Sequence, residues 1–455
     1  MPRPSKGPRL FSAEDKENSI LGFASWVNQY GVNDQSTDYR AARDLLLCLE
    51  PRTFSPVTQT QDHIEKAIDW ALKLDHSVLP IQGPPGTGKS YTAGKMIIGL
   101  IKKGKKIGVT ALSHKVIGSL LGTIWNMAEE EKLSIKMIQK VRVESDMVPW
   151  QEETEKDNII AAMNTHDVIA GTPFMWAATR SMNELDYLFV DEAGQLSLID
   201  TLSIARVAKN LILLGDPQQL KQPQQGVHPD GTEVSALEHI LKQNQTITDL
   251  QGIFLGTTRR MHPSICSFDS DMFYEGKLEA LPGLEKQEIS GNTSYTGFGL
   301  RYLSVEHAGN TNASPEEVQA VKDIIQELTK GDVYWTDEHE RVHLLTLNDI
   351  KVISPYNAQV NALAQSIPGL MVGTVDKFQG QEAAVIIYSM ATSTPEDAPR
   401  GMDFLYSPNR LNVAVSRARA MFIMVANPAI FSPVCKSPQQ IRLANPFCVF
   451  LEEMT

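Results

Sequence analysis

From about Val57 onward, the chain alternates short apolar runs with longer amphipathic stretches. Strands of a parallel sheet are buried on both faces and read as continuous apolar runs, whereas the helices that connect them are amphipathic. The pattern therefore predicts an α/β protein. The runs that we interpret as strands are Ser77–Gln82, Lys106–Leu112, Asp167–Gly171, Tyr187–Val190 and Asn210–Leu214, followed by Lys351–Ser354, Leu370–Gly373, Ala384–Met390 and Ala420–Val425.

The two sets of strands predict two α/β domains in tandem with parallel sheets, at residues 57–256 and 257–428. A polar tail and one or two helices precede them in residues 1–56, and a helical tail follows in residues 429–455. The stretch Trp125–Asp157 interrupts the alternation and is interpreted as a helical insertion, at about residues 125–160, without a chemical role. Ser314-Pro315-Glu316-Glu317 has the N-cap and first-turn residues of a helix, which we expect to run to Lys330.

Charge and hydropathy narrow the classes of partner. The net charge of −12 argues against a broad basic face, so a nucleic-acid site would be a local groove. The basic run Ile101–Lys106 falls at a predicted helix end, where cations complement the helix dipole, and is not counted as a site. No apolar run approaches the ~20 residues that a membrane span needs, so we expect no membrane contact and a cytoplasmic protein. Four cysteines without C-x-x-C spacing indicate lone thiols rather than a metal centre.

A glycine-rich loop follows the first predicted strand and precedes a helix. In such a loop the backbone N–H groups surround phosphates, Lys89 supplies a charge to the β and γ oxygens, and Ser90 offers a hydroxyl to Mg²⁺. The strand before and the helix after make an incidental glycine turn a poor alternative. The sequence therefore predicts an ATP site, with Tyr91 added from the helix, formed by Gly83, Pro84, Pro85, Gly86, Thr87, Gly88, Lys89 and Ser90.

Two further strands end in polar residues suited to hydrolysis. Asp191 and Glu192 follow Val190 at the carboxyl end of a buried run, where ligands bind in open α/β sheets. We expect Asp191 to hold Mg²⁺ and Glu192 to deprotonate the attacking water. Gln219 follows the next predicted strand, and its neutral amide is a candidate γ-phosphate sensor. Alone, each feature would be interpreted as a solvated turn.

The motifs GPPGTGKS, DEAGQ, GDPQQL, TTRRMHP, VDKFQGQE and LNVAVSRAR, in this order, resemble superfamily 1 helicases. The chain is similar to the superfamily 1B branch, which includes the nonsense-mediated-decay helicase and the Okazaki-fragment nuclease-helicase. The resemblance covers about Val57 to Pro428. The sequence resembles still more closely the helicase half of bacterial proteins that have a RecB-like nuclease upstream. Residues 1–56 are too few for a nuclease, so we expect either a protein without one or a fragment of a longer chain.

The resemblance implies roles for residues of the second domain. Arg260 and Arg417 would be arginine fingers that reach the γ-phosphate across a cleft between the domains, with Arg410 and Arg419 as supports. ATP binding would close this cleft and hydrolysis would reopen it. Glu382 corresponds to a ribose contact. Arg259 stands where relatives carry an aromatic residue that stacks on adenine, and a guanidinium plane can also stack. Gln61 is the candidate for reading the adenine edge, with Gln59 as the alternative.

The resemblance also implies a track for single-stranded DNA or RNA with 5′→3′ movement. Its candidate residues follow predicted strands and are Ser113, His114, Thr172, Pro173, Pro355, Tyr356, Thr374 and Val375. For His114 and Tyr356, a packed core or surface role is an equal alternative. Two other activities remain open: an ATPase switch or assembly factor that does not move on nucleic acid, and a small-molecule kinase. The first leaves the motifs of the second domain without a use, and the second does not require a tandem domain.

Overall fold

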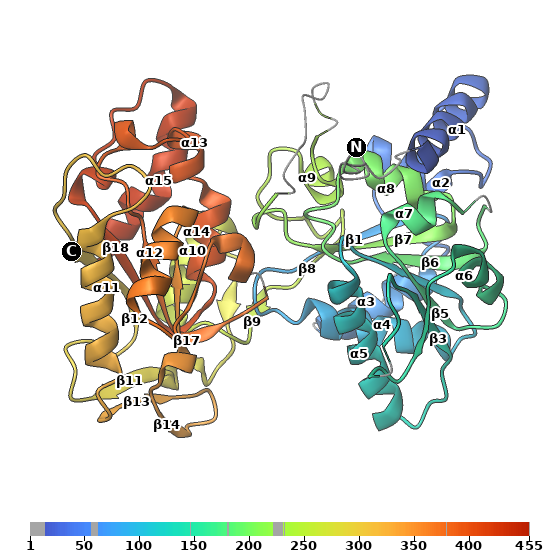
Figure 1. Cartoon of the computed structure of the whole chain (residues 1–455). Helices are drawn as coiled ribbons and strands as arrows, with labels where there is room; N and C mark the ends of the chain where they lie inside the picture. Colours follow the sequence, from blue (N-terminus) through green and yellow to red (C-terminus); the bar gives the residue numbers. More distant parts are fainter. Residues whose placement is uncertain are drawn as a thin grey trace, which may run out of the picture. The chain divides into compact units, whose positions relative to one another are not determined.

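The computed structural model describes residues 14–55, 62–145, 147–179, 182–221, 231, 233–378 and 380–454. Their contacts divide the chain into two compact units (Figure 1). The first unit contains the described residues up to Gln82, with Lys89–Pro217 and Lys221–Phe254. The second contains Leu255 onward, together with two short loops, Gly83–Gly88 and Gln218–Leu220.

The first unit is built on a parallel sheet. Among its described residues, the sheet has eight strands in the order β4-β3-β5-β2-β6-β7-β1-β8, and all the pairings are parallel. Every residue of β1 and β2 is buried. The carboxyl ends of parallel strands lie at one edge, so the loops that follow them gather there. The strands are β1 (Val78–Gln82), β2 (Ile107–Thr110), β3 (Met137–Lys140), β4 (Gln151–Glu153), β5 (Val168–Ala170), β6 (Leu185–Val190), β7 (Ala208–Gly215) and β8 (Ile253–Phe254).

Helices cover both faces of this sheet (Figure 1). On one face lie α3 (His63–Lys73), α4 (Lys89–Ile101) and α5 (His114–Glu130). On the other lie α1 (Glu14–Tyr30), α2 (Arg40–Leu47), α7 (Pro173–Ala177) and α8 (Leu198–Ala205). The remaining helices are α6 (Lys156–Ala162) and α9 (Ala236–Leu241). Phe23 of α1 and Leu45 of α2 belong to the same buried core as Leu188 of β6, so the N-terminal helices are part of the first unit.

The second unit has a smaller sheet that is also parallel. Its described strands have the order β12-β18-β17-β15-β16. An antiparallel sheet, β11-β13-β14, and a short pair, β9-β10, complete it. The strands are β9 (Thr257–Thr258), β10 (Glu279–Ala280), β11 (Glu288–Gly291), β12 (Gly299–Ser304), β13 (Val333–Thr336), β14 (Val342–Leu344), β15 (Ile350–Ile353), β16 (Met371–Gly373), β17 (Ala383–Ser389) and β18 (Ala418–Ala426).

Alternate residues of β18 serve two cores. Met421 and Ile423 pack with α11 and α12, whereas the ring of Phe422 lies 5.8 Å from that of Phe450 in α15. Helices therefore cover both faces of this sheet. The helices are α10 (Pro263–Phe273), α11 (Pro315–Leu328), α12 (Asn357–Ser366), α13 (Met402–Leu405), α14 (Pro408–Val415) and α15 (Pro438–Glu452), with single 3₁₀ turns at Leu284–Lys286, Leu347–Asp349, Val375–Phe378, Pro395–Asp397 and Pro428–Phe431.

The α/β fold predicted from the apolar runs is confirmed, and each of the nine predicted strands overlaps an observed one. The predicted N-cap is present as well, since the Ser314 hydroxyl accepts a hydrogen bond from Glu317 N at 3.1 Å. The helical insertion is wrong: after α5 ends at Glu130, β3 and β4 extend the sheet, and α6 follows. These strands are short and lie at the sheet margin, where β4 is partly exposed, so they lack a long apolar run. Among the described residues, no helix has the length and apolar character of a membrane span.

Candidate nucleotide and nucleic-acid sites

The glycine-rich loop lies between β1, which ends at Gln82, and α4, which begins at Lys89. Gly86 and Gly88 have φ angles of +76° and +80°, a region that glycine adopts without strain. A Cβ atom on Gly86 would lie 2.5 Å from Oγ1 of Thr258, so the close approach also requires glycine. The Thr87 hydroxyl donates a hydrogen bond to Pro84 O at 2.7 Å and curls the loop. The predicted strand, loop and helix are therefore all present.

Two residues of the second unit bind this loop. Oγ1 of Thr258 donates a hydrogen bond to Pro85 O at 2.9 Å, and Arg259 N donates to Gly86 O at 2.9 Å. These bonds group the loop with the second unit. The backbone of Arg259 is thereby fixed beside the loop, while its side chain is exposed. Adenine stacking by Arg259 stays a prediction. Gln61 and its alternative Gln59 lie outside the described residues.

The two adjacent carboxylates differ in conformation. Asp191 directly follows β6 and is buried, and its Oδ1 accepts a hydrogen bond from Glu192 N at 2.9 Å. Glu192 has a φ of +56°, and its Oε2 accepts a hydrogen bond from the Gln195 amide at 3.4 Å. The left-handed backbone turns the Glu192 side chain away from the direction that a continued strand would give it. One carboxylate is thus buried and the other lies on the turn.

The environment of Asp191 suits a divalent cation. Burial, and then the charge of Glu192, raise the pKa of Asp191 to about 7. A nearby cation would favour the ionised form and offset this cost. Ser90 is exposed in the first turn of α4 and offers a hydroxyl oxygen. Carboxylate and hydroxyl oxygens are the ligands that Mg²⁺ accepts, so the residues present fit this ion.

Gln219 and the arginine that the resemblance implies as a finger are in contact. Nη2 of Arg417 donates a hydrogen bond to Oε1 of Gln219 at 3.4 Å, while Nε of Arg417 donates to Val413 O at 3.1 Å. Two asparagines of α14 bind the same loop through their amide groups: Asn412 donates to Gln218 O at 3.1 Å, and Asn409 donates to Gln219 O at 2.5 Å. The structure therefore joins the candidate sensor to Arg417.

Arg260 is held by a carboxylate. Its Nε donates to Oε2 of Glu382, and its Nη1 donates to Ser416 O at 3.0 Å. The other oxygen of Glu382 accepts a hydrogen bond from Arg419, which also pairs with Glu338 at 3.3 Å. Burial alone would raise the pKa of Glu382, but the charges and hydrogen bonds of Arg260 and Arg419 outweigh it and lower the pKa to about 2. Glu382 therefore anchors two arginines, and its predicted ribose contact is untested.

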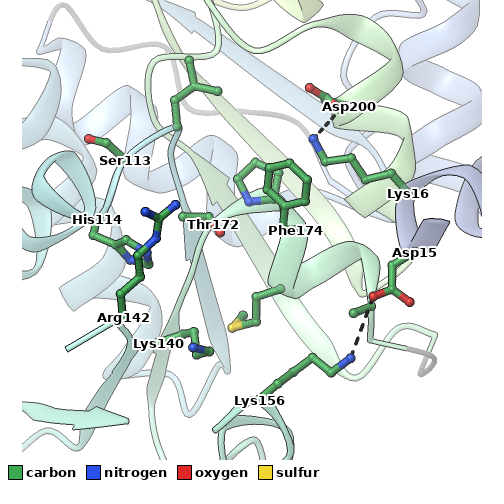
Figure 2. Close-up of a pocket in the computed structure, with 14 residues that line it drawn as sticks. Asp15, Lys16, Ser113, His114, Lys140, Arg142, Lys156, Thr172, Phe174 and Asp200 are labelled. Atoms are coloured by element: carbon green, nitrogen blue, oxygen red, sulfur yellow. Dashed lines mark hydrogen bonds and ion pairs between the residues drawn. The ribbon is translucent and has the colours of Figure 1, made fainter. Parts of the chain in front are cut away.

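Four predicted nucleic-acid residues of the first unit line one pocket of 710 Å³: Ser113, His114, Thr172 and Pro173 (Figure 2). Ser113 follows β2 and caps α5, and its hydroxyl accepts a hydrogen bond from Val116 N at 3.2 Å. Thr172 and Pro173 follow β5, the neighbour of β2 in the sheet. Nδ1 of His114 is buried and makes no hydrogen bond within the described part of the chain. The structure brings these four residues together.

The predicted residues of the second unit are less open. Tyr356 is 6% exposed, and its ring centroid lies 5.5 Å from that of Phe404. Val375 is fully buried within a 3₁₀ turn, so its side chain serves the core. Thr374 is half-buried between β16 and that turn. Nucleic-acid contact stays a prediction for Pro355, Tyr356, Thr374 and Val375. In the structure, the side chains of Tyr356 and Val375 are packed in the interior.

Several residues beside these sites were missed. Asn412 lies in the motif LNVAVSRAR, and Asn409 lies two positions before it. Their place in or near a motif that contains an arginine-finger candidate was the available signal. Lys140 and Arg142 line the same pocket as Ser113 but lie in the stretch that was interpreted as a helical insertion. Phe174 directly follows Pro173 and is 47% exposed. An exposed aromatic next to a predicted contact was a signal in the sequence.

Two family models match most of the chain between them. Residues 59–250 match a family model described as an AAA domain, and residues 232–429 match another with the same description. The chain is 28% identical over 412 residues to putative helicase mov-10-B.1 of Danio rerio, covering 76% of this chain and 39% of the relative.

Two further relatives also match most of this chain. The chain is 26% identical to the DNA replication ATP-dependent helicase/nuclease DNA2 of Gallus gallus, covering 85% of this chain and 38% of the relative. It is 24% identical to the regulator of nonsense transcripts 1 homolog of Arabidopsis thaliana, covering 79% and 32%. The chain thus spans between a third and two fifths of the length of these relatives. With the parallel sheets and the ordered motifs, these matches confirm the resemblance: the chain is a homologue of the superfamily 1 helicases, with two RecA-like, AAA-type domains in tandem.

Proposed function

We propose that this protein couples ATP hydrolysis to movement along single-stranded DNA or RNA, as a helicase or translocase. One observation carries the proposal: the candidate catalytic carboxylates and the candidate strand contacts follow strands of the same sheet. Strand β6 ends at the carboxylates Asp191 and Glu192. Its neighbour β2, and β5 on the far side of β2, end at the pocket lined by Ser113 and Thr172. Events at the phosphates can therefore be transmitted to a bound strand through adjoining loops of a rigid sheet.

ATP would be bound by the loop that starts at Gly83, with Lys89 placing its charge on the β and γ phosphates. Ser90 and Asp191 would hold Mg²⁺, which when bound neutralises charge that develops on the phosphate oxygens. Glu192 would orient the attacking water and accept its proton. Its position on a left-handed turn after the strand supports this role, because among the described residues only Gln195 donates a side-chain hydrogen bond to this carboxylate.

Arg260 and Arg417 would stabilise the charge of the transferring phosphoryl group. Both belong to the unit whose contacts include the glycine loop and Gln219. The bond between Arg417 and Gln219 supports a joint role, since an amide that loses its phosphate partner on hydrolysis can change the hydrogen bonding of the arginine. Arg260 is anchored by Glu382 and Ser416, which limits the entropy lost when it binds phosphate.

The resemblance to superfamily 1B helicases suggests movement in the 5′→3′ direction. The relative from Gallus gallus is named as a helicase/nuclease, and this chain spans 38% of its length. A nuclease that is associated with this protein, or fused to it in a longer chain, is therefore part of the proposal. The choice between DNA and RNA depends on contacts to the 2′-hydroxyl and is left to experiment.

The test is the rate of ATP hydrolysis with and without matched single-stranded DNA and RNA oligonucleotides. We expect phosphate release to rise several-fold with at least one of the two. Hydrolysis that does not respond to either strand would favour an ATPase switch over a motor. Formation of a phosphorylated small-molecule acceptor, in place of free phosphate, would favour a kinase.

A further inference from the structure

Several residues that line the pocket at Ser113 and Thr172 lie outside the helicase motifs. Three further segments contribute to its lining: Lys16 from α1, Lys140 and Arg142 from the end of β3, and Lys156 from α6. Figure 2 shows His114, Lys140 and Arg142 on one side, Lys16 and Lys156 on the other, and Thr172 and Phe174 in between. All of them belong to the first unit.

The lining is basic, although the chain as a whole carries a net charge of −12. It contains four cationic side chains, Lys16, Lys140, Arg142 and Lys156, against two carboxylates, Asp15 and Asp200. Each carboxylate is paired with one of the lysines: Lys16 lies 2.8 Å from Asp200, and Lys156 lies 3.9 Å from Asp15. Lys140 and Arg142 lie on the other side of the pocket, away from these two pairs (Figure 2).

Lys140 and Arg142 are oriented toward the predicted strand contacts. The Lys140 ammonium donates a hydrogen bond to Val141 O at 2.9 Å, and its charge also acts on the Glu153 carboxylate. Arg142 is exposed. Burial, and then the positive charge of Arg142, lower the pKa of His114, with a further contribution from the charge of Lys140. Both cations therefore act on the same space as His114, where an anion would reduce their mutual repulsion.

Phe174 presents an aromatic ring to this space from a fixed backbone. It is 47% exposed, although the following residues of α7, Met175 and Trp176, are buried. The Trp176 indole donates a hydrogen bond to Val109 O of β2 at 3.2 Å, which ties α7 to the sheet. The Lys16 ammonium lies 4.0 Å from the ring centroid. Proteins that hold single strands combine a basic groove with aromatic side chains on which bases stack.

We propose that this pocket binds a nucleotide unit of the single strand, with Lys140 and Arg142 contacting its phosphate and Phe174 stacking on its base. The inference rests on the proposed function and assigns binding residues outside the helicase motifs. It gives the segment from β3 to α6 a use in strand binding. Lys16, paired with Asp200 beside the ring, lines the opposite wall.

The test is fluorescence anisotropy with labelled single-stranded oligothymidine and oligouridine, measured over a range of salt concentrations. We expect Arg142→Ala and Lys140→Ala each to weaken binding several-fold and to reduce the slope of log affinity against log salt by about 0.7, the value for one lost phosphate contact on a single strand. The matched control is Lys103→Ala, an exposed lysine in the basic run that was discounted, which should bind like the wild type.

Phe174 is tested by three substitutions. Phe174→Ala should bind roughly 5- to 150-fold more weakly, the loss expected for one stacked base. Phe174→Tyr should retain binding, whereas Phe174→Leu, which keeps an apolar side chain, should lose it. If Phe174 only packs against α1, Leu and Tyr would behave alike. Circular dichroism and the melting temperature establish that each variant is folded.

The outcomes separate this inference from the proposed function. A wild-type protein that binds neither oligonucleotide overturns both. A wild type that binds, with Arg142→Ala, Lys140→Ala and Phe174→Leu variants of unchanged affinity and salt dependence, overturns this inference alone. Weaker binding of these variants, with the Lys103→Ala variant unaffected, supports it.

Discussion

The carboxylate of Glu382 accepts a hydrogen bond from Nε of Arg260, the residue that we propose as an arginine finger. The second carboxylate oxygen binds Arg419, and the Glu382 carbonyl accepts a hydrogen bond from Lys351 at 2.6 Å. Glu382 therefore sets the orientation of Arg260 through one side chain. Orienting Arg260 is a different role from the ribose contact that the resemblance implies for Glu382. The two roles predict different effects of a substitution on kcat and KM.

We predict that Glu382→Gln lowers kcat for ATP hydrolysis by about 10- to 100-fold, the scale of a misplaced catalytic group, with little change in KM. The amide keeps the size of the side chain but removes the charge that holds Arg260. Glu338→Gln is the control, because Glu338 pairs with Arg419 and not with Arg260. A rise in KM at constant kcat would instead support the ribose contact.

The same carboxylate predicts a pH dependence of stability. The pKa of Glu382 is lowered from 4.5 to about 2 in the folded protein. A carboxyl with a lowered folded pKa stabilises the fold above its unfolded pKa, and this contribution is lost as the pH falls through the folded value. The melting temperature of the wild type should therefore exceed that of the Glu382→Gln variant at pH 6, and the gap should narrow between about pH 4.5 and pH 2.

A gap that stays constant over this range would show that the difference between glutamate and glutamine arises from packing. Because Glu382 is about one third exposed, solvent screens its ion pairs, and we expect a modest effect.

For Arg417, we predict a loss of turnover of ~10³-fold or more in the Arg417→Ala variant, with ATP binding retained. The Arg417→Lys variant should also lose turnover. A lysine ammonium lacks the planar guanidinium with which Arg417 donates hydrogen bonds to both Val413 O and Gln219 Oε1. Single-turnover hydrolysis and nucleotide binding measure the two quantities. Arg301→Ala is the control, since the hydrogen bonds of Arg301 go to carbonyls of Leu300 and Thr296. Turnover near that of the wild type would remove Arg417 from the site.

Two variants distinguish the role of the glycine loop from the role of the carboxylate turn. Lys89→Ala should weaken ATP binding, because it removes the charge from the phosphates. Glu192→Gln should retain ATP and lose hydrolysis, because an amide cannot accept the proton of water. Lys95→Ala, in the same helix and paired with Glu131 at 3.3 Å, should match the wild type. Substantial hydrolysis by the Glu192→Gln variant would contradict its role as the base.

The nine strands that the sequence predicts are each a short apolar run bounded by polar residues. The sequence also predicts the caps, since Ser314 and Pro315 specify a helix start by local chemistry. The strands Met137–Lys140 and Gln151–Glu153 were not predicted, because their burial depends on neighbouring strands that the periodicity of the sequence does not reveal. The site residues of known motifs follow from order and spacing.

The additional lining residues do not follow from the sequence. Lys16 and Arg142 are separated by 126 positions along the chain and meet in one pocket through the fold. The anchoring of Arg260 by Glu382 is equally non-local, over 122 positions. Such relationships require coordinates, because a charged residue in isolation is read as a solvated surface.

The central claim is movement along a strand driven by ATP, and displacement of streptavidin from biotinylated oligonucleotides tests it most directly. We predict ATP-dependent displacement from the 3′ end of at least one of single-stranded DNA and RNA, little from the 5′ end, and none with the Glu192→Gln variant. ATP hydrolysis that is stimulated by the strand without displacement from either end would contradict the account.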